Sequence, residues 1–118
     1  MALEILKELH DIRTSIDEIE NFIAETSSYK KFLEDKKTLY AVERKLEIIG
    51  ECVLRIMRRD PFIQIENARR IIQFRNRIAH EYDKIDYTIL WSVVKNHLPL
   101  LKQDVLLLID KLNNHGVG

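Results

Sequence analysis

The sequence contains few residues that interrupt helices and few that build disulfide or metal sites. Among 118 residues there are three glycines, two prolines and one cysteine. A single cysteine, Cys52, excludes an intramolecular disulfide and a metal site made of several cysteines, and it fits a reducing compartment. Because Cys52 lies within an apolar run, we expect a small buried core residue.

The sequence also lacks an apolar run of about 18 residues, which a transmembrane helix requires. Its first residues, MALEILKELHD, carry acids too early for a signal peptide. These features predict a cytoplasmic protein with no membrane partner. The 19 basic and 19 acidic residues balance, so no overall charge draws the chain to nucleic acid or to an anionic membrane.

Apolar residues recur at alternating steps of three and four along most of the chain, which is the pattern of amphipathic helices. Cap residues and breaks divide this pattern into segments. The expected helices cover residues 5–23, 39–56, 65–79 and 87–113, with a short helix between the first two that begins at Ser27 or Ser28 and ends before Asp35. We therefore predict an all-α fold, an antiparallel up-and-down bundle of four to five helices, as a single domain spanning residues 1–118.

Two residues interrupt the expected helices. Gly50 costs about 1 kcal/mol relative to alanine inside a helix, so it either marks a close approach of another backbone or has no special role. Pro99 removes one helical hydrogen bond and clashes with the carbonyl of Lys95, which predicts a kink in the last helix. That helix is apolar on more than one side, which predicts an interface between two copies of the chain.

Charge is distributed unevenly, although the totals balance. Residues 55–80 contain seven arginines, no lysine and two acids. Arginine presents a flat fork of donors that matches phosphate oxygens, and it stays charged when partly buried. A solvated helix face with glutamate partners is the favoured explanation for the outer arginines, which are Arg58, Arg59, Arg69 and Arg70. For Arg75 we favour a functional role.

Residues 75–82, RNRIAHEY, concentrate chemistry at the end of the third long helix. RNA cleavage requires a base for the 2′-hydroxyl, an acid for the 5′-oxygen and a cation for the pentavalent phosphorane. His80 can move protons near neutral pH, and Arg75 supplies the cation. On an ideal helix these two residues point about 140° apart. Fraying near His80, or a cleft shared with a second subunit, would let both reach one phosphate.

Other chemistries have less support in the sequence. His10, His97 and His115 show no metal-ligand spacing with one another or with His80, and no glycine-rich phosphate loop occurs. His97 falls on the apolar stripe of the last helix, which predicts a packed or interfacial histidine. We therefore expect neither a metal nor a cofactor.

The segment RNRIAHEY resembles the R-x4-6-H motif of the HEPN (higher eukaryotes and prokaryotes nucleotide-binding) superfamily. Its longer form, R-x4-H-x-Y, resembles that of the HepT-like toxins, which are partners of MNT-type nucleotidyltransferase antitoxins. Further resemblance, in the same order, lies in AVERKLEIIGECVLRI, DPFIQIENARRIIQFRNRIAHEYDKIDYTILW and NHLPLLKQDV. The resemblance covers most of the chain from about residue 40 onward. It implies a dimerising helical bundle, metal-independent endoribonuclease activity on RNA, and neutralisation by a nucleotidyltransferase in a toxin–antitoxin module.

The resemblance also implies a role for each motif position. Arg75 and His80 would be catalytic, with Arg75 holding the phosphate and His80 acting as general acid or base. Asn76 would help to position RNA, and Tyr82 would receive AMP from the nucleotidyltransferase. Arg77 fills a variable slot of the motif, so its contact with RNA is an electrostatic inference. AMP on Tyr82 would add charge and bulk beside His80, which would block an RNA cleft.

Two other interpretations stay open. In the first, the chain is a non-catalytic subunit whose dimer binds a nucleotide or the nucleotidyltransferase, and the arginines serve only as phosphate contacts. In the second, it is a purely structural helical dimer. Substitution of Arg75 and His80 distinguishes these cases, because catalysis predicts loss of cutting with RNA binding retained.

Overall fold

The computed structural model describes residues 2–26, 28–81 and 85–114, with the side chains of residues 2 and 79–81 excepted. The predicted modification site, Tyr82, lies outside these residues. Throughout the described ranges the regular structure is helical, and no strand occurs there. The elements are α1 (Ala2–Ile23), α2 (Tyr29–Glu34), α3 (Lys36–Arg59), the 3-10 helix η1 (Glu66–Ala68), α4 (Arg69–Glu81), α5 (Tyr87–Ser92), the π-helical η3 (Val93–His97) and α6 (Leu98–Leu112).

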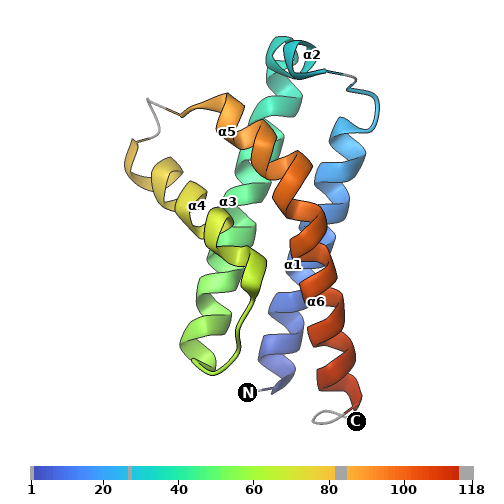
Figure 1. Ribbon diagram of the computed structural model, residues 1–118, viewed down its shortest axis with the longest axis vertical. Helices are drawn as coiled ribbons and strands as arrows, with labels where there is room; N and C mark the ends of the chain where they lie inside the picture. The colour runs from blue at the N-terminus through green and yellow to red at the C-terminus, as the bar shows by residue number, and fades with distance from the viewer. Residues whose placement is uncertain (1, 27, 82–84, 115–118) are drawn as a thin grey trace.

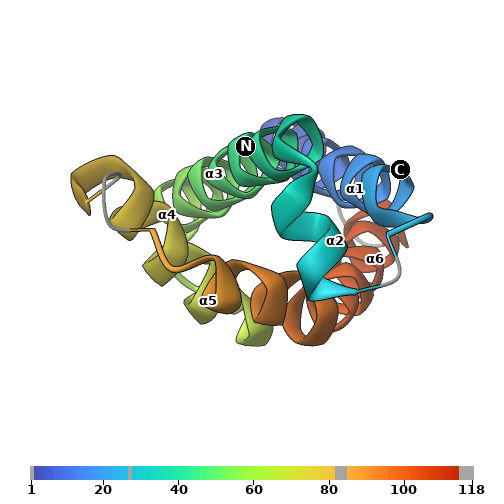
Figure 2. The same ribbon diagram turned by 90° about the horizontal axis from the view of Figure 1, so that it is seen from above.

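The long helices run in alternating directions (Figure 1). In that view α1 rises, α3 descends, α4 rises and α6 descends, while α2 lies across the upper end of the bundle (Figure 2). The chain forms a compact body of 46 × 30 × 19 Å. The expected all-α fold is confirmed for the described residues. Within those residues, no helix combines the length and the apolar character needed to cross a membrane.

The core forms where the predicted apolar stripes of α1 and α3 face each other. Burial of one large apolar side chain contributes about 1.5–3 kcal/mol to folding, so these two helices supply much of the driving force. Their core side chains are Ile5, Leu9, Ile12, Ile16 and Ile19 from α1, and Leu39, Val42, Leu46, Ile49, Val53 and Ile56 from α3. Phe32 of α2 closes the same core at one end, where its ring packs on that of Trp91 at a centroid distance of 4.9 Å.

Side-chain caps explain where three of the helices begin. The Oγ of Ser28 accepts a hydrogen bond from the backbone N–H of Lys31 at 3.2 Å. Asp35 starts α3 by accepting from the N–H of Thr38 at 3.1 Å, and Asp86 starts α5 in the corresponding way. These bonds satisfy backbone donors that a helix leaves unpaired in its first turn. The predicted starts at Ser28 and Asp86 are confirmed.

The final helical region begins at Tyr87 as predicted and runs without a gap to Leu112, but it is not α-helical throughout, because the π-helical η3 lies between α5 and α6. The backbone N–H of Leu98 donates to the carbonyl of Val93, five residues earlier, and this widens the chain into a π turn. Pro99 follows in the first turn of α6, where its missing N–H costs least. The helix changes direction between α5 and α6, at the region where Pro99 predicts a kink (Figure 1).

Helix α6 divides its leucines between the core and the surface. Leu98, Leu101 and Val105 are buried, whereas Leu107 has 70% of its surface exposed. Leu100 and Leu106 are exposed as well. The apolar surface from which the sequence predicts an interface is therefore present on α6, and dimerisation itself stays a prediction.

Candidate functional site

Helix α4 carries the predicted motif on a firmly anchored backbone. Its inner face buries Ile71, Phe74 and Ile78. Just before the helix, the backbone N–H and the side-chain amide of Asn67 both donate to Oδ2 of Asp104 in α6, at 3.1 and 2.8 Å. These contacts fix the start and the rotation of α4, so its outer face presents polar side chains to solvent. That face includes Arg69, Arg70, Gln73, Asn76 and Arg77.

Gly50 of α3 lies against the side chain of Arg75 on α4. A Cβ atom added at Gly50 would lie 2.6 Å from Cβ and 2.8 Å from Cγ of Arg75. Both distances are far shorter than a carbon–carbon contact of about 3.5–4.0 Å. The helices reach this separation only because position 50 has no side chain. Gly50 therefore marks a close approach, and what it accommodates is the stem of Arg75.

The guanidinium of Arg75 keeps donors available. Its Nη1 donates to Oδ1 of Asn76 at 3.3 Å. Its Nε is buried and has no hydrogen-bond partner among the described residues. A buried donor without a partner costs about 1–3 kcal/mol, and such groups in native proteins often belong to binding or catalytic sites. Arg75 is thus a half-buried cation with one hydrogen bond and one unpartnered donor among the described residues.

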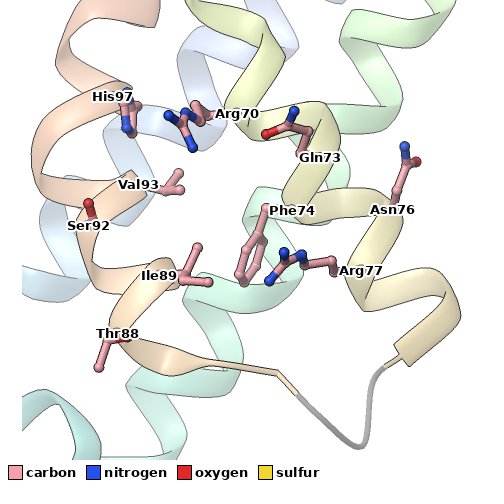
Figure 3. Close-up of a pocket in the computed structure, with 10 residues that line it drawn as sticks. All are labelled: Arg70, Gln73, Phe74, Asn76, Arg77, Thr88, Ile89, Ser92, Val93 and His97. Carbon is pink, nitrogen blue, oxygen red and sulfur yellow. The ribbon is translucent and has the colours of Figure 1, made fainter.

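A groove of about 660 Å³ separates α4 from α5 and η3. Figure 3 shows Arg70 and His97 pointing toward each other at one end of it, while Arg77 lies beside the ring of Phe74 near Ile89. Its lining consists of Arg70, Gln73, Phe74, Asn76, Arg77, Thr88, Ile89, Ser92, Val93 and His97. The groove thus combines cationic, hydroxyl and apolar side chains. Two of the predicted RNA-binding residues, Asn76 and Arg77, lie in it.

The backbone of His80 continues the helix, because α4 extends to Glu81. The fraying that would let His80 and Arg75 converge does not occur at this position. Side chains five residues apart on a regular helix differ in direction by about 140°. The side chain of His80 lies outside the described part of the structure. The backbone of a single α4 helix therefore does not direct Arg75 and His80 toward the same phosphate.

The arginines of the basic segment fall into two groups. Arg55 pairs with Glu8 of α1, with Nε and Oε2 separated by 3.0 Å, and Arg59 pairs with Glu4. Among the described side chains, none of the arginines of α4 has a carboxylate within 4 Å. The four outer arginines, Arg58, Arg59, Arg69 and Arg70, are exposed as expected, and among the described side chains only Arg59 has a carboxylate partner.

Cys52 and Glu43 on α3 and Tyr87 on α5 have raised pKa values. Burial, together with the neighbouring Glu8 carboxylate, raises the pKa of the Cys52 thiol to about 12, and Cys52 is the buried core residue expected from the sequence. Burial also raises the pKa of Glu43, while a hydrogen bond from Tyr87 acts in the opposite direction. Burial and the same carboxylate raise the pKa of Tyr87 to about 12. Cys52 and Tyr87 are therefore poor proton carriers for catalysis at neutral pH.

No group of three or more His, Cys, Asp and Glu side chains within the described ranges is arranged to hold a metal ion. The groove is lined by arginine, amide, hydroxyl and histidine side chains together with apolar ones. Sequence reasoning missed two members of the groove, Arg70 and His97, because their proximity depends on the packing of α4 against η3. It also gave no certain role to Gly50, although a glycine inside a long helix was a usable signal.

Comparison with known proteins agrees with the resemblance seen in the motif. Residues 12–107 match the family model described as "Ribonuclease HepT-like". The chain is 39% identical over 95 residues to "Probable ribonuclease HepT" of Thermococcus cleftensis, covering 80% of this chain and 86% of that protein. It is 35% identical over 99 residues to "Putative RNase MJ1380" of Methanocaldococcus jannaschii, covering 82% and 89%. No solved structure matches the chain significantly. With a family model matching most of its length, the chain belongs to the HepT-like ribonuclease family.

Proposed function

We propose that this chain is a metal-independent endoribonuclease and the toxin of a HEPN/MNT toxin–antitoxin module of the type VII kind. The observation that carries the proposal is the state of Arg75. Its guanidinium makes one hydrogen bond among the described residues, to Asn76, which lines the groove together with Arg70 and Arg77. This arrangement suits a phosphodiester, which presents several anionic oxygens to planar donors. Family membership supports RNA as the substrate.

In the proposed reaction, His80 acts as the proton carrier. A base removes the proton of the 2′-hydroxyl, the 2′-oxygen attacks phosphorus, and the bond from phosphorus to the 5′-oxygen breaks as an acid protonates that oxygen. The products are a 2′,3′-cyclic phosphate and a 5′-hydroxyl, and no water or metal is consumed. Arg75 stabilises the charge that develops on the phosphorane, while Asn76 and Arg77 hold neighbouring phosphates.

A dimer would bring together two catalytic groups that point in different directions within one copy. Because α4 stays helical through His80, Arg75 and His80 of one copy diverge by about 140°. A cleft between two copies allows Arg75 from one helix and His80 from the other to approach the same phosphate, and it supplies two histidines for the two proton transfers. The exposed leucines of α6, including Leu107, are candidates for the surface that pairs.

Neutralisation is proposed to act on Tyr82, two residues after His80. A partner nucleotidyltransferase would transfer AMP to the phenolic oxygen of Tyr82. The added phosphate is anionic, so it would repel the RNA backbone and occupy space next to the general acid or base. This modification accounts for the position of a tyrosine so close to the catalytic histidine.

The alternative is a non-catalytic subunit that binds a nucleotide or the nucleotidyltransferase. The observation in its favour is the same groove, since Arg70, Arg77 and the ring of Phe74 also suit a mononucleotide. The two functions differ in what His80 does. In the alternative, RNA is not cut, and replacement of His80 leaves the cellular effect of the protein unchanged.

The test is RNA cleavage by purified wild type and His80→Ala in the presence of a chelator, with growth of an expressing bacterial host followed in parallel. We expect the wild type to cut RNA and to arrest growth, and His80→Ala to do neither while still binding RNA. Arg58→Ala, which removes an exposed arginine at the end of α3, is the matched control and should behave as wild type. Well-folded wild type that leaves RNA intact would overturn the proposal and favour the alternative.

A further inference from the structure

The groove has a second cationic end that the motif does not include. Arg70 and His97 point toward each other across it, from α4 and from the end of η3 (Figure 3). Arg70 is exposed and has no carboxylate within 4 Å among the described side chains. The apolar stripe predicts a packed or interfacial histidine at position 97, and the imidazole is partly buried and lines the groove.

The π turn explains why His97 lies in the groove. Residues 93–97 have one residue more per turn than an α-helix, and the N–H of Leu98 bonds to the carbonyl of Val93. The additional residue rotates the positions that follow relative to the α-helical pattern from which the stripe is predicted. Single π turns within helices often occur at functional sites. Here the turn lies next to His97, whose imidazole lines the same groove as Arg70.

The two cationic ends of the groove are separated along one helix face. Arg70 and Arg77 are seven residues apart, which is nearly two full turns, so their Cα atoms lie on the same side of α4 about 10 Å apart along its axis. Phe74 and Val93 are buried beneath the stretch between them, and Ile89 is the exposed apolar side chain there, while Thr88 and Ser92 line the groove from α5 (Figure 3). Cationic side chains at both ends of the groove and apolar side chains between them are typical of a site that binds one nucleotide of a nucleic-acid strand.

We propose that this groove binds single-stranded RNA next to the cleavage point, with Arg70 and His97 holding a phosphate one step away from the phosphate held at Arg77 and Asn76. The intervening base rests on Ile89, whose side chain is exposed in the groove. The cavity volume of about 660 Å³ is within the range of small-molecule pockets, about 300–1,000 Å³. A base can enter only when it is unstacked, which selects loops and single strands over duplex RNA.

The inference rests on the proposed function, because it assigns RNA to the same surface. Its test is therefore a binding measurement that does not require cleavage. A short single-stranded oligouridine with 2′-O-methyl groups cannot form the cyclic phosphate, so wild type binds it without cutting. The variants are Arg70→Gln and His97→Asn, and the matched control is Arg69→Gln, an exposed arginine next to Arg70 that does not line the groove.

We expect Arg70→Gln to raise the Kd about tenfold and to reduce the slope of log affinity against log salt by about 0.7, the value for one phosphate contact on a single strand. His97→Asn should weaken binding less, and Arg69→Gln should bind as wild type. With a cleavable substrate, Arg70→Gln should raise KM and leave kcat close to wild type, because it removes a contact to the flanking strand.

Several outcomes would overturn the inference. Equal binding by wild type, Arg70→Gln and His97→Asn would show that this end of the groove does not hold RNA. Equal competition by duplex RNA or by ATP would show that the groove does not select an unstacked strand. Failure of the proposed function is a separate result: there, the salt slopes change as expected while a cleavable RNA stays intact.

Discussion

The interface between α1 and α3 and the outer face of α4 use arginine in opposite ways. At the first, Arg55 and Arg59 are paired with Glu8 and Glu4 of α1. On the second, the arginines face solvent or the groove, and no described carboxylate lies within ion-pair distance. Both sets come from one basic stretch of sequence. Arginine content alone therefore does not identify a binding surface, and the acids that fold against it decide its role.

Arg75→Ala is expected to have the largest effect on RNA cleavage relative to its effect on stability. Removal of a preorganised donor to a developing charge lowers rates by about 10²–10³-fold, and we expect that loss in RNA cleavage. The melting temperature should change little, because the guanidinium makes only one hydrogen bond within the described residues, to Asn76. Initial cleavage rates and thermal unfolding measure the two effects. Arg75→Lys keeps the charge but not the planar fork, so it should restore activity only in part; an Ala variant as active as wild type would contradict the assignment.

Gly50→Ala is expected to have the second-largest effect on cleavage, because the added methyl group on α3 would displace Arg75 on α4. The new Cβ would lie 2.6 Å from Cβ of Arg75, so the helices must separate or the arginine must shift. Overpacking costs about 1–3 kcal/mol, offset by about 1 kcal/mol of helix propensity, and a misplacement of about 1 Å can lower the rate 10²-fold. Cleavage rates and urea unfolding test this, with Glu51→Ala as the control.

A double-mutant cycle isolates the Gly50 contact. Gly50→Ala should destabilise the Arg75→Gly variant less than it destabilises the wild type, because the atom it meets has been removed. If the two costs are equal, the close approach of position 50 to Arg75 does not set the helix separation.

Arg55→Gln tests the structural side of the comparison. It leaves the Glu8 carboxylate, of which only 10% is exposed, without its cation. Loss of one partner of a buried pair costs about 3–5 kcal/mol, and because Arg55 itself is 42% exposed we expect a smaller loss of about 1–3 kcal/mol. Urea unfolding measures it. RNA cleavage at a temperature well below unfolding should match the wild type, and a large loss of activity there would place Arg55 in the site instead.

The smallest effect is expected from Glu43→Gln, which removes an acid on α3 that has no cation within 4 Å among the described side chains. Burial raises the pKa of Glu43 in the folded state, so the folded protein holds that proton more tightly than the unfolded chain. Its contribution to stability is present at low pH and is lost as pH rises through the raised pKa. The glutamine side chain carries no charge, so the variant should melt higher at neutral pH, by less than about 4 °C.

A pH series decides this prediction. The advantage of Glu43→Gln should shrink as the pH falls through the raised pKa of Glu43, because the wild-type carboxyl is then neutral as well. If the variant melts lower than the wild type at neutral pH, the hydrogen bond from Tyr87 matters more than the burial of the charge.

Local features of the fold were predictable from the sequence, and contacts between distant segments were not. The stripes of α1 and α3, the cap at Ser28 and the burial of Cys52 follow from neighbouring residues, and the structure confirms them. The pairing of Arg55 with Glu8 joins residues 47 positions apart, and it depends on the register of two helices. The π turn depends on a backbone hydrogen bond that no periodicity indicates.

The sequence motif of the site could be predicted, but the other residues that line the groove could not. Asn76 and Arg77 line the groove, whereas Arg75 does not: its stem lies against Gly50 of α3, and its guanidinium is bonded to Asn76. Arg70 and His97 join it only through the packing of α4 against η3. The catalytic roles of Arg75 and His80, the modification of Tyr82, and the assignment of residues 1–118 to one domain stay predictions.

The contact between Gly50 and Arg75 also limits how freely the arginine moves. Its Cβ and Cγ lie against backbone that has no rotamer to change, so the side chain can turn only beyond Cγ. A free arginine carries about 2 kcal/mol of rotamer entropy, part of which must be lost when it binds a ligand. Because α3 already restricts the stem, Arg75 has lost some of that entropy on folding. The missing side chain at position 50 thus makes Arg75 a stiffer and more ready ligand for an anion.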